Sequence, residues 1–125
     1  MKYSADKQEK YVTLQLNEEK LDTTLAPELK SEFATLQAEG FKHIIMNLAD
    51  VKYIDSSGLS ALLNGNRLFG GNGSFILCAV QDHVMKLISI SQLDKVLDIL
   101  PTQEEAVDAV FMNDIEGNLK EEGGK

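Results

Sequence analysis

Two short segments of almost unbroken apolar residues, HIIMNL at 43–48 and SFILCAV at 74–80, constrain the fold of this chain more than any other feature. A half-exposed strand alternates apolar and polar residues, so runs of this kind predict strands that are covered on both faces. Each run is followed by a helical pattern, at 56–69 and at 82–91, and Asp82 can cap the second helix. Strands that alternate with helices predict a mostly parallel sheet with right-handed crossovers.

The N-terminal segments extend this pattern. YVTLQL at 11–16 alternates apolar and polar residues and predicts a strand with one buried face. Residues 2–8 are expected to pair with it as an antiparallel edge strand. Apolar residues at helical spacing predict an amphipathic helix over 25–39, with Pro27 near its start and Gly40 just after its end.

The C-terminal segments complete the predicted order of strands and helices. VLDIL at 96–100 predicts a short strand that stops at Pro101, and TQEE at 102–105 is a capping-box sequence that opens a last helix. Residues 113–125 lack an apolar period and are expected to form a flexible polar tail. The sequence therefore predicts one α/β domain over 1–112, a mixed and mostly parallel sheet in the order ββαβαβαβα. The residues expected inside the last helix are Ala106, Val107, Val110 and Phe111.

The net charge of the chain bears on its partners. Twenty acidic residues against 12 basic ones give a formal charge of −8, which repels nucleic-acid phosphates and anionic membranes and favours a basic protein surface. The single cysteine, Cys78, lies in an apolar run and is expected to be a buried, reduced thiol. No signal peptide is evident, and no apolar run approaches the roughly 20 residues of a membrane span. We expect a cytoplasmic protein.

The junction YIDSSGLSALL at 53–63 is the candidate functional site, because a polar cluster there separates a strand from a helix. A serine-hydrolase elbow needs Gly-x-Ser-x-Gly, which is missing, and neither His43 nor His83 stands in a recognisable relation to the serines. The pattern of a phosphate-binding P-loop is missing as well, and no His or Cys cluster indicates a metal. The sequence therefore predicts neither an enzyme nor a cofactor or metal site.

The simplest role of this junction is to cap the helix. Asp55 or Ser56 can accept hydrogen bonds from the first helical turn, which is worth about 1 kcal/mol. Capping does not explain Gly58, which costs up to ~1 kcal/mol against alanine inside a helix. We interpret Gly58 as a point where a partner protein or an enzyme needs close access.

Three segments of the chain resemble the STAS domain family, and more narrowly the bacterial anti-sigma-factor antagonists. The resemblance covers residues 10–111, with the D-V-x-x-I-D-S-S-G-L junction and the L-D-K-V-L segment in the family's order. It implies a STAS-like single domain. The segments are LNEEKLDTTLAPELKSEF, HIIMNLADVKYIDSSGLSALL and GSFILCAVQDHVMKLISISQLDKVLDILPTQEEAV.

The resemblance also implies a function. In this family an anti-sigma factor with serine kinase activity phosphorylates the serine directly after the aspartate, and only the unphosphorylated antagonist binds that factor and releases the sigma factor. By position, Ser56 is the implied phosphorylation site. The kinase brings ATP and magnesium, and a phosphatase reverses the modification. The implied partner-binding residues are Asp22, Asp55, Ser56, Ser57 and Gly58.

Other readings of the sequence stay open. STAS domains also serve as accessory subunits of phospholipid-transporting ABC systems, where the fold docks on the ATPase, and self-association of the domain is left open. The chain departs from the family at Glu19 and Ser60, where glycine is common, and Asn64, Gly65 and Asn66 predict a polar, weak stretch in the helix. These departures bear on partner specificity rather than on the fold.

Overall fold

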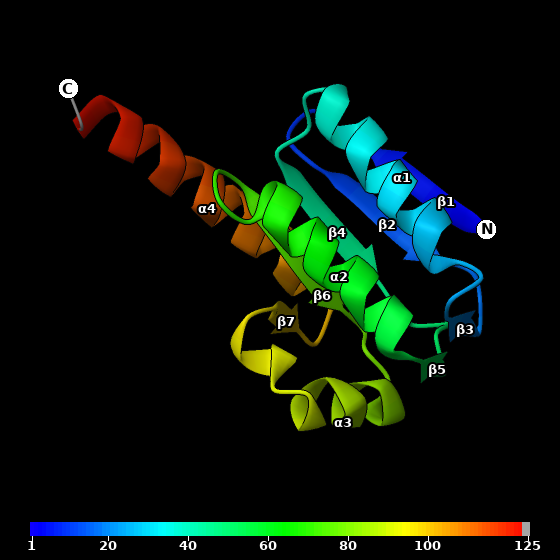
Figure 1. Ribbon diagram of the computed structural model, residues 1–125. Coiled ribbons are helices and arrows are strands. Elements are labelled where there is room, and N and C mark those ends of the chain that lie inside the picture. Colours follow the sequence, from blue (N-terminus) through cyan, green and yellow to red (C-terminus); the bar gives the residue numbers. More distant parts are fainter. Residues whose placement is uncertain (124–125) are drawn as a thin grey trace.

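The computed structural model describes residues 1–123, and the side chains of residues 1–116, as a central β-sheet with helices on both faces (Figure 1). The elements in chain order are β1 (Tyr3–Lys7), β2 (Val12–Leu16), β3 (Lys20–Leu21), α1 (Ala26–Ala38), β4 (His43–Asn47), β5 (Tyr53–Ile54), α2 (Ser56–Phe69), β6 (Ser74–Cys78), α3 (Asp82–Ile90), the 3-10 turn η1 (Leu93–Lys95), β7 (Asp98–Leu100) and α4 (Gln103–Gly123). The five-stranded sheet has the order β1-β2-β4-β6-β7. The pair β1–β2 is antiparallel and the other neighbours are parallel, so the predicted mixed sheet is confirmed.

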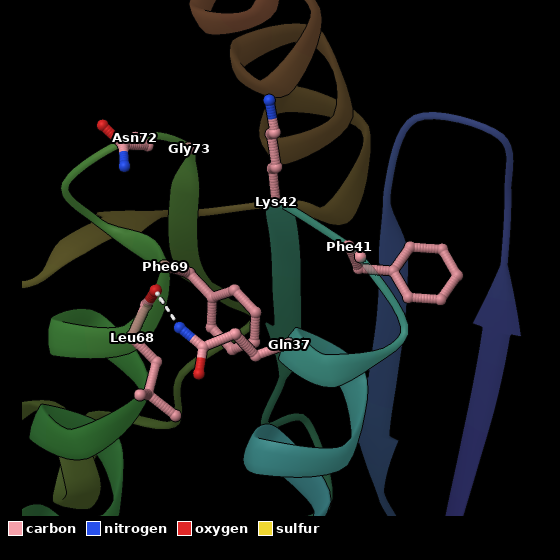
Figure 2. A pocket seen from close by; sticks show the side chains of 8 residues that line it. Gln37, Phe41, Lys42, Leu68, Phe69, Asn72 and Gly73 are labelled. Atoms are coloured by element: carbon pink, nitrogen blue, oxygen red, sulfur yellow. Dashed lines mark hydrogen bonds between the residues drawn. The ribbon is translucent and has the colours of Figure 1, made fainter.

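Helices α1 and α2 lie side by side on one face of the sheet (Figure 1). Pro27 lies in the first turn of α1, and Gly40, with a φ of 96°, follows its last turn in the left-handed region that glycine adopts without strain. Where the two helices end, the side-chain amide of Gln37 donates a hydrogen bond of 3.2 Å to the carbonyl oxygen of Leu68. This contact borders a cavity of about 230 Å³ (Figure 2).

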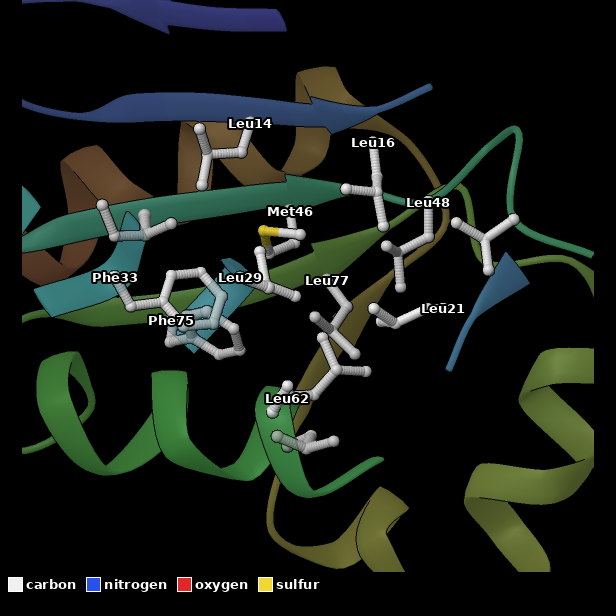
Figure 3. Packing of buried hydrophobic residues seen from close by; sticks show 14 of the residues in the cluster. Leu14, Leu16, Leu21, Leu29, Phe33, Met46, Leu48, Leu62, Phe75 and Leu77 are labelled. Carbon is white, nitrogen blue, oxygen red and sulfur yellow. The ribbon is translucent and has the colours of Figure 1, made fainter. Parts of the chain in front are cut away.

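The central strands are buried on both faces, which explains their unbroken apolar sequences. In β4, Ile44 and Met46 belong to the large core under α1 and α2, whereas Ile45 faces the smaller core under α4. In β6, Phe75 and Leu77 face the large core in the same way. Figure 3 shows Leu14, Leu16, Leu29, Phe33, Met46, Leu62, Phe75 and Leu77 packed together in this large core.

Helix α4 covers the opposite face of the sheet. Its residues Ala106 and Val110 pack with Ile76 and Cys78 in the smaller core. The predicted burial of Cys78 is confirmed, and burial raises the pKa of its thiol to about 11, which keeps the thiol protonated at neutral pH. The predicted cap of α4 is present, because Thr102 Oγ1 accepts a hydrogen bond of 3.1 Å from a backbone amide in the first turn.

Two local predictions in these helices are wrong. Asp82 does not cap α3: the residue at the cap position is Gln81, whose side chain makes no capping hydrogen bond, and Asp82 lies in the first helical turn. Phe111 was expected inside the fold, yet its side chain is 44% exposed and its ring packs against the Tyr11 ring in a T-shaped pair with a centroid distance of 5.9 Å. Phe111 lies beyond the small core that buries the preceding turn of α4, so nothing covers its outer side in the described part of the chain.

The boundary predicted between the domain and a polar tail does not coincide with the end of α4. The helix continues past Met112, and its next turn is attached to the sheet by Asn113, which donates a hydrogen bond of 2.9 Å to Ser74 Oγ. Asp114 lies 3.4 Å from His43 Nε2. The last two residues of the predicted tail lie outside the described part. No helix in that part is both long and apolar enough to cross a membrane.

Candidate functional site

A second, two-stranded sheet, which the sequence analysis did not predict, brings together the two segments of the candidate site. Strands β3 and β5 pair in parallel, with Leu21 opposite Ile54. Asp22 and Asp55 are the next residues along each strand, so both leave the small sheet at the same edge. The backbone amide of Asp55 also donates a hydrogen bond of 3.3 Å to the carbonyl oxygen of Leu21.

The carboxylate of Asp55 is held by bonds on both of its oxygens. Oδ1 accepts a hydrogen bond of 2.9 Å from the amide of Gly58, which confirms Asp55 as the cap of α2. Oδ2 accepts two bonds of 3.3 Å from Thr23, one from the backbone amide and one from the hydroxyl. Asp55 therefore ties the segment after β3 to the first turn of α2.

Asp22 forms a compact turn beside it. Its Oδ1 accepts hydrogen bonds from the amide of Thr24 at 3.0 Å and from the hydroxyl of Thr24 at 2.6 Å. The bond from this hydroxyl is the largest cause that lowers the pKa of Asp22, so the side chain is a carboxylate at neutral pH. A cavity of about 460 Å³ adjoins the turn, lined by Glu18, Glu19, Lys20, Asp22, Thr24 and Leu25. The structure thus places Asp22 next to Asp55 in one acidic region.

The two serines of the junction differ in their surroundings. Ser57 is half-buried, and its Oγ lies 3.1 Å from Thr23 Oγ1, within hydrogen-bond distance. Ser56 is exposed, and no hydrogen bond joins its hydroxyl to another residue of the described part. Of the two hydroxyls, the one on Ser56 is available to a visiting molecule.

Gly58 has an internal explanation, which replaces the interpretation that a partner needs close access to it. Gly58 is buried, and a Cβ atom built on it would overlap the carbonyl oxygen of Leu21 and lie 2.7 Å from Cγ1 of Ile54. A glycine is therefore required for α2 to pack against β3 and β5. The sequence could not show this, because Leu21 is distant along the chain.

A cavity of about 360 Å³ opens beside the serines, between the starts of α1 and α2. Sequence reasoning missed two of the residues that line it, Thr23 and Lys30. Neither belongs to a motif, and the one signal that could have found Lys30 is its position one turn after the start of the helix that follows Asp22. The lining residues are Thr23, Ala26, Pro27, Lys30, Ser56, Ser57 and Ser60.

Within the described residues, this site does not bring together the serine and histidine that a serine hydrolase needs. His43 is buried at the start of β4, where its Nδ1 lies 2.9 Å from Ser74 Oγ, and His83 is exposed on α3. No hydrogen bond joins either imidazole to Ser56 or Ser57 within the described residues. Among the same residues, no group of three or more potential ligands could hold a metal ion. The arrangement suits a rigid docking surface with one free hydroxyl.

Comparisons with known proteins agree with this fold. The family model of the STAS domain matches residues 2–106. A Thermotoga neapolitana protein, provisionally described as an anti-sigma-factor antagonist, is 32% identical over 73 residues, which cover 58% of this chain and 65% of the relative. The match thus spans less than two thirds of that relative's length.

Solved structures show the same likeness. The crystal structure of a Thermotoga maritima protein, provisionally described as an anti-sigma-factor antagonist, superimposes with a TM-score of 0.79 at 27% identity and covers 86% of this chain and 93% of that protein. The Bacillus protein SpoIIAA in its phosphorylated form gives a TM-score of 0.67 at 24% identity, covering 87% and 99% of the two chains. At that identity the second likeness concerns the fold alone.

Proposed function

The chain belongs to the STAS domain family, and we propose that it is an anti-sigma-factor antagonist controlled by phosphorylation of Ser56. In the unphosphorylated form it binds an anti-sigma factor that is a serine kinase, and this binding releases the sigma factor. The domain is then a protein-binding module and not an enzyme. The partner supplies ATP and magnesium, a phosphatase removes the phosphate, and the whole cycle takes place in the cytoplasm.

The observation that carries this proposal is the free, exposed hydroxyl of Ser56 beside groups that are all engaged. Asp55 is bonded through both carboxylate oxygens, and Ser57 lies against Thr23. A kinase can therefore reach Ser56 Oγ without first breaking a contact of the folded domain. In the transfer, Oγ bonds to the terminal phosphorus of ATP, a base of the partner takes the hydroxyl proton, and ADP leaves.

The surface around Ser56 suits a basic partner. Asp22 is a carboxylate at neutral pH and lies at the same edge of the small sheet as Asp55, and the chain as a whole carries a charge of −8. Opposite charge on the partner raises the rate of encounter and orients the two proteins. We infer that Asp22, Asp55, Ser56 and Ser57 face the partner, and that Gly58 acts indirectly by letting α2 approach β3.

Phosphorylation of Ser56 affects the affinity for the partner more than the stability of the folded domain. Phosphoserine adds about −1.5 to −2 charges at the start of a helix, where the positive end of the helix dipole tolerates them. In a closed interface, the same dianion next to Asp55 loses its water. An uncompensated buried charge costs several kcal/mol, and ~1.4 kcal/mol corresponds to a tenfold loss of affinity.

The experiment that tests the proposal is a kinase assay with matched variants. The domain, Ser56→Ala and Ser57→Ala are incubated with Mg-ATP and a histidine-kinase-like anti-sigma factor from the same organism, and intact masses are measured. We expect one added phosphate on the wild type and on Ser57→Ala, and none on Ser56→Ala. Equal modification of both variants, or modification of neither the wild type nor the variants, contradicts the proposal. Stable binding to a transporter ATPase in place of the kinase would favour the accessory-subunit role.

A further inference from the structure

The cavity beside Ser56 contains one positive group. Among the described residues that line it, Lys30 is the only charged one, and the others are hydroxyl-bearing or apolar. Lys30 is half-buried on α1, and no carboxylate of the described residues forms a salt bridge with it. In a chain with a charge of −8, an ammonium group without an anionic partner at the edge of a cavity is an unusual placement.

The present partner of Lys30 is a neutral hydroxyl. Its Nζ donates a long hydrogen bond of 3.4 Å to Ser60 Oγ. Ser60 stands four residues after Ser56 on α2, and residues at this spacing lie on the same helix face with Cβ atoms about 5–6 Å apart. The ammonium group therefore lies about one helical turn from Ser56, within the range that the flexible stem of a lysine covers by changing rotamers.

The hydroxyls around this lysine add hydrogen-bonding capacity. Ser57 and Thr23 line the same cavity, and their hydroxyls lie 3.1 Å apart. The carboxylate next to Ser56 in the chain is Asp55, which does not line the cavity and whose two oxygens are already held by Gly58 and Thr23. A phosphate on Ser56 would meet repulsion from Asp55 on one side and a mobile cation on the other, and an ammonium-to-phosphate bond is stronger than an ammonium-to-hydroxyl bond.

We propose that Lys30 receives the phosphoryl group of phosphorylated Ser56 in an ion pair that spans α1 and α2. The inference rests on the proposed function only in taking Ser56 as the residue that carries the phosphate. In this state the ammonium group of Lys30 breaks its hydrogen bond to Ser60, and the phosphate on Ser56 occupies the cavity between α1 and α2. Lys30 thus offsets one unit of the roughly −1.5 to −2 charges that the phosphate adds, and the remaining negative charge still faces the partner.

The test uses phosphoserine installed at position 56 during translation, so that no kinase is needed. The second ionisation of the phosphate is followed by phosphorus NMR between pH 4 and 8, in the wild-type background and with Lys30→Gln, Lys30→Arg or Arg67→Gln. Arg67 is exposed on α2, eleven residues after Ser56. At 1.5 Å per residue this is roughly 16 Å from Ser56, which is beyond the Debye length. Arg67→Gln thus removes the same charge without removing the proposed contact.

A cation beside the phosphate favours the dianion and lowers its pKa. We expect the pKa of this phosphate to rise by roughly 0.5–1 unit in Lys30→Gln, a three- to tenfold change in the ionisation constant, and to stay near the wild-type value in Lys30→Arg and Arg67→Gln. Equal values in Lys30→Gln and Arg67→Gln overturn the inference. The NMR titration and the kinase assay do not depend on each other. A negative titration rejects only the Lys30 ion pair, and a negative kinase assay rejects only the proposed function.

Discussion

At the scale of single residues, neighbouring residues of the junction have different structural roles. Asp55 holds the backbone by accepting bonds from the first turn of α2 and from the segment after β3. Ser57 packs against that segment, whereas Ser56 is exposed and its hydroxyl forms no hydrogen bond with another described residue. The capping role of Asp55 could be predicted from the sequence, because a strand, an aspartate and a helix follow each other along the chain. The difference between the serines could not, because it depends on Thr23.

Gly58 gives a first prediction at this scale. Alanine at this position would place a methyl group against the Leu21 carbonyl oxygen, and overpacking of this kind costs about 1–3 kcal/mol. The control is Gly71→Ala, since a Cβ atom built there has no neighbour within 4 Å. We expect urea unfolding to show a lower free energy of unfolding for Gly58→Ala and little change for Gly71→Ala. Equal stability of the two variants would show that α2 does not need to approach β3 so closely.

His43 gives a prediction about pH. Burial lowers the pKa of its imidazole, although Asp114 opposes this effect; Lys42 and Lys10, the positive groups near it, lower the pKa further. The folded protein therefore binds this proton less readily than the unfolded chain, whose histidine pKa is about 6.5. Stability from this residue is complete above pH ~6.5 and is lost as the pH falls through the folded-state pKa.

The measurement is the free energy of unfolding between pH 7.5 and 5 for the wild type, His43→Gln and His83→Gln. We expect the wild type and the variant of the exposed His83 to lose stability on acidification alike, and His43→Gln to lose less. The same dependence in all three proteins would mean that burial of His43 has no influence on its proton.

At the scale of elements, the site depends on two strands of two residues each. Neither β3 nor β5 is long enough to show a periodic pattern, so the sequence did not reveal them. The long elements were different: the predicted bounds of α2, 56–69, agree with the structure. The polar stretch expected to weaken this helix does not interrupt it. Gly65 within it is buried, and a Cβ atom there would overlap the ring of Phe75.

Helix α4 gives a prediction at the scale of elements. A chain ended after Met112 lacks Asn113 and Asp114, which leaves Ser74 and His43 with fewer partners. Buried polar groups that lose a hydrogen bond cost about 1–3 kcal/mol. We expect this shortened chain to unfold at a lower urea concentration than a chain ended after Glu116, which retains both contacts. Identical midpoints would show that the helix contributes no stability beyond Met112, as expected for the tail predicted from the sequence.

At the scale of the whole molecule, the fold separates stability from recognition. The two cores lie on either face of the five-stranded sheet, whereas the acidic turn, the free hydroxyl and the cavity with Lys30 gather around β3, β5 and the starts of α1 and α2. The sequence predicted the sheet because burial on both faces leaves long apolar runs. It did not predict the cavity, because Lys30 and Ser60 belong to different helices and meet only when these pack.

The central claim is that a phosphate on Ser56 prevents a partner from docking on the folded domain. Its most direct test is an ATP-free calorimetric titration of the anti-sigma factor with three proteins: the unmodified domain, the domain with phosphoserine at position 56, and a control with phosphoserine at Ser4, an exposed residue of the edge strand β1. We expect phosphoserine at position 56 to weaken the affinity at least tenfold and phosphoserine at position 4 to leave it nearly unchanged. Equal affinity of the unmodified and the Ser56-phosphorylated domain would contradict the account.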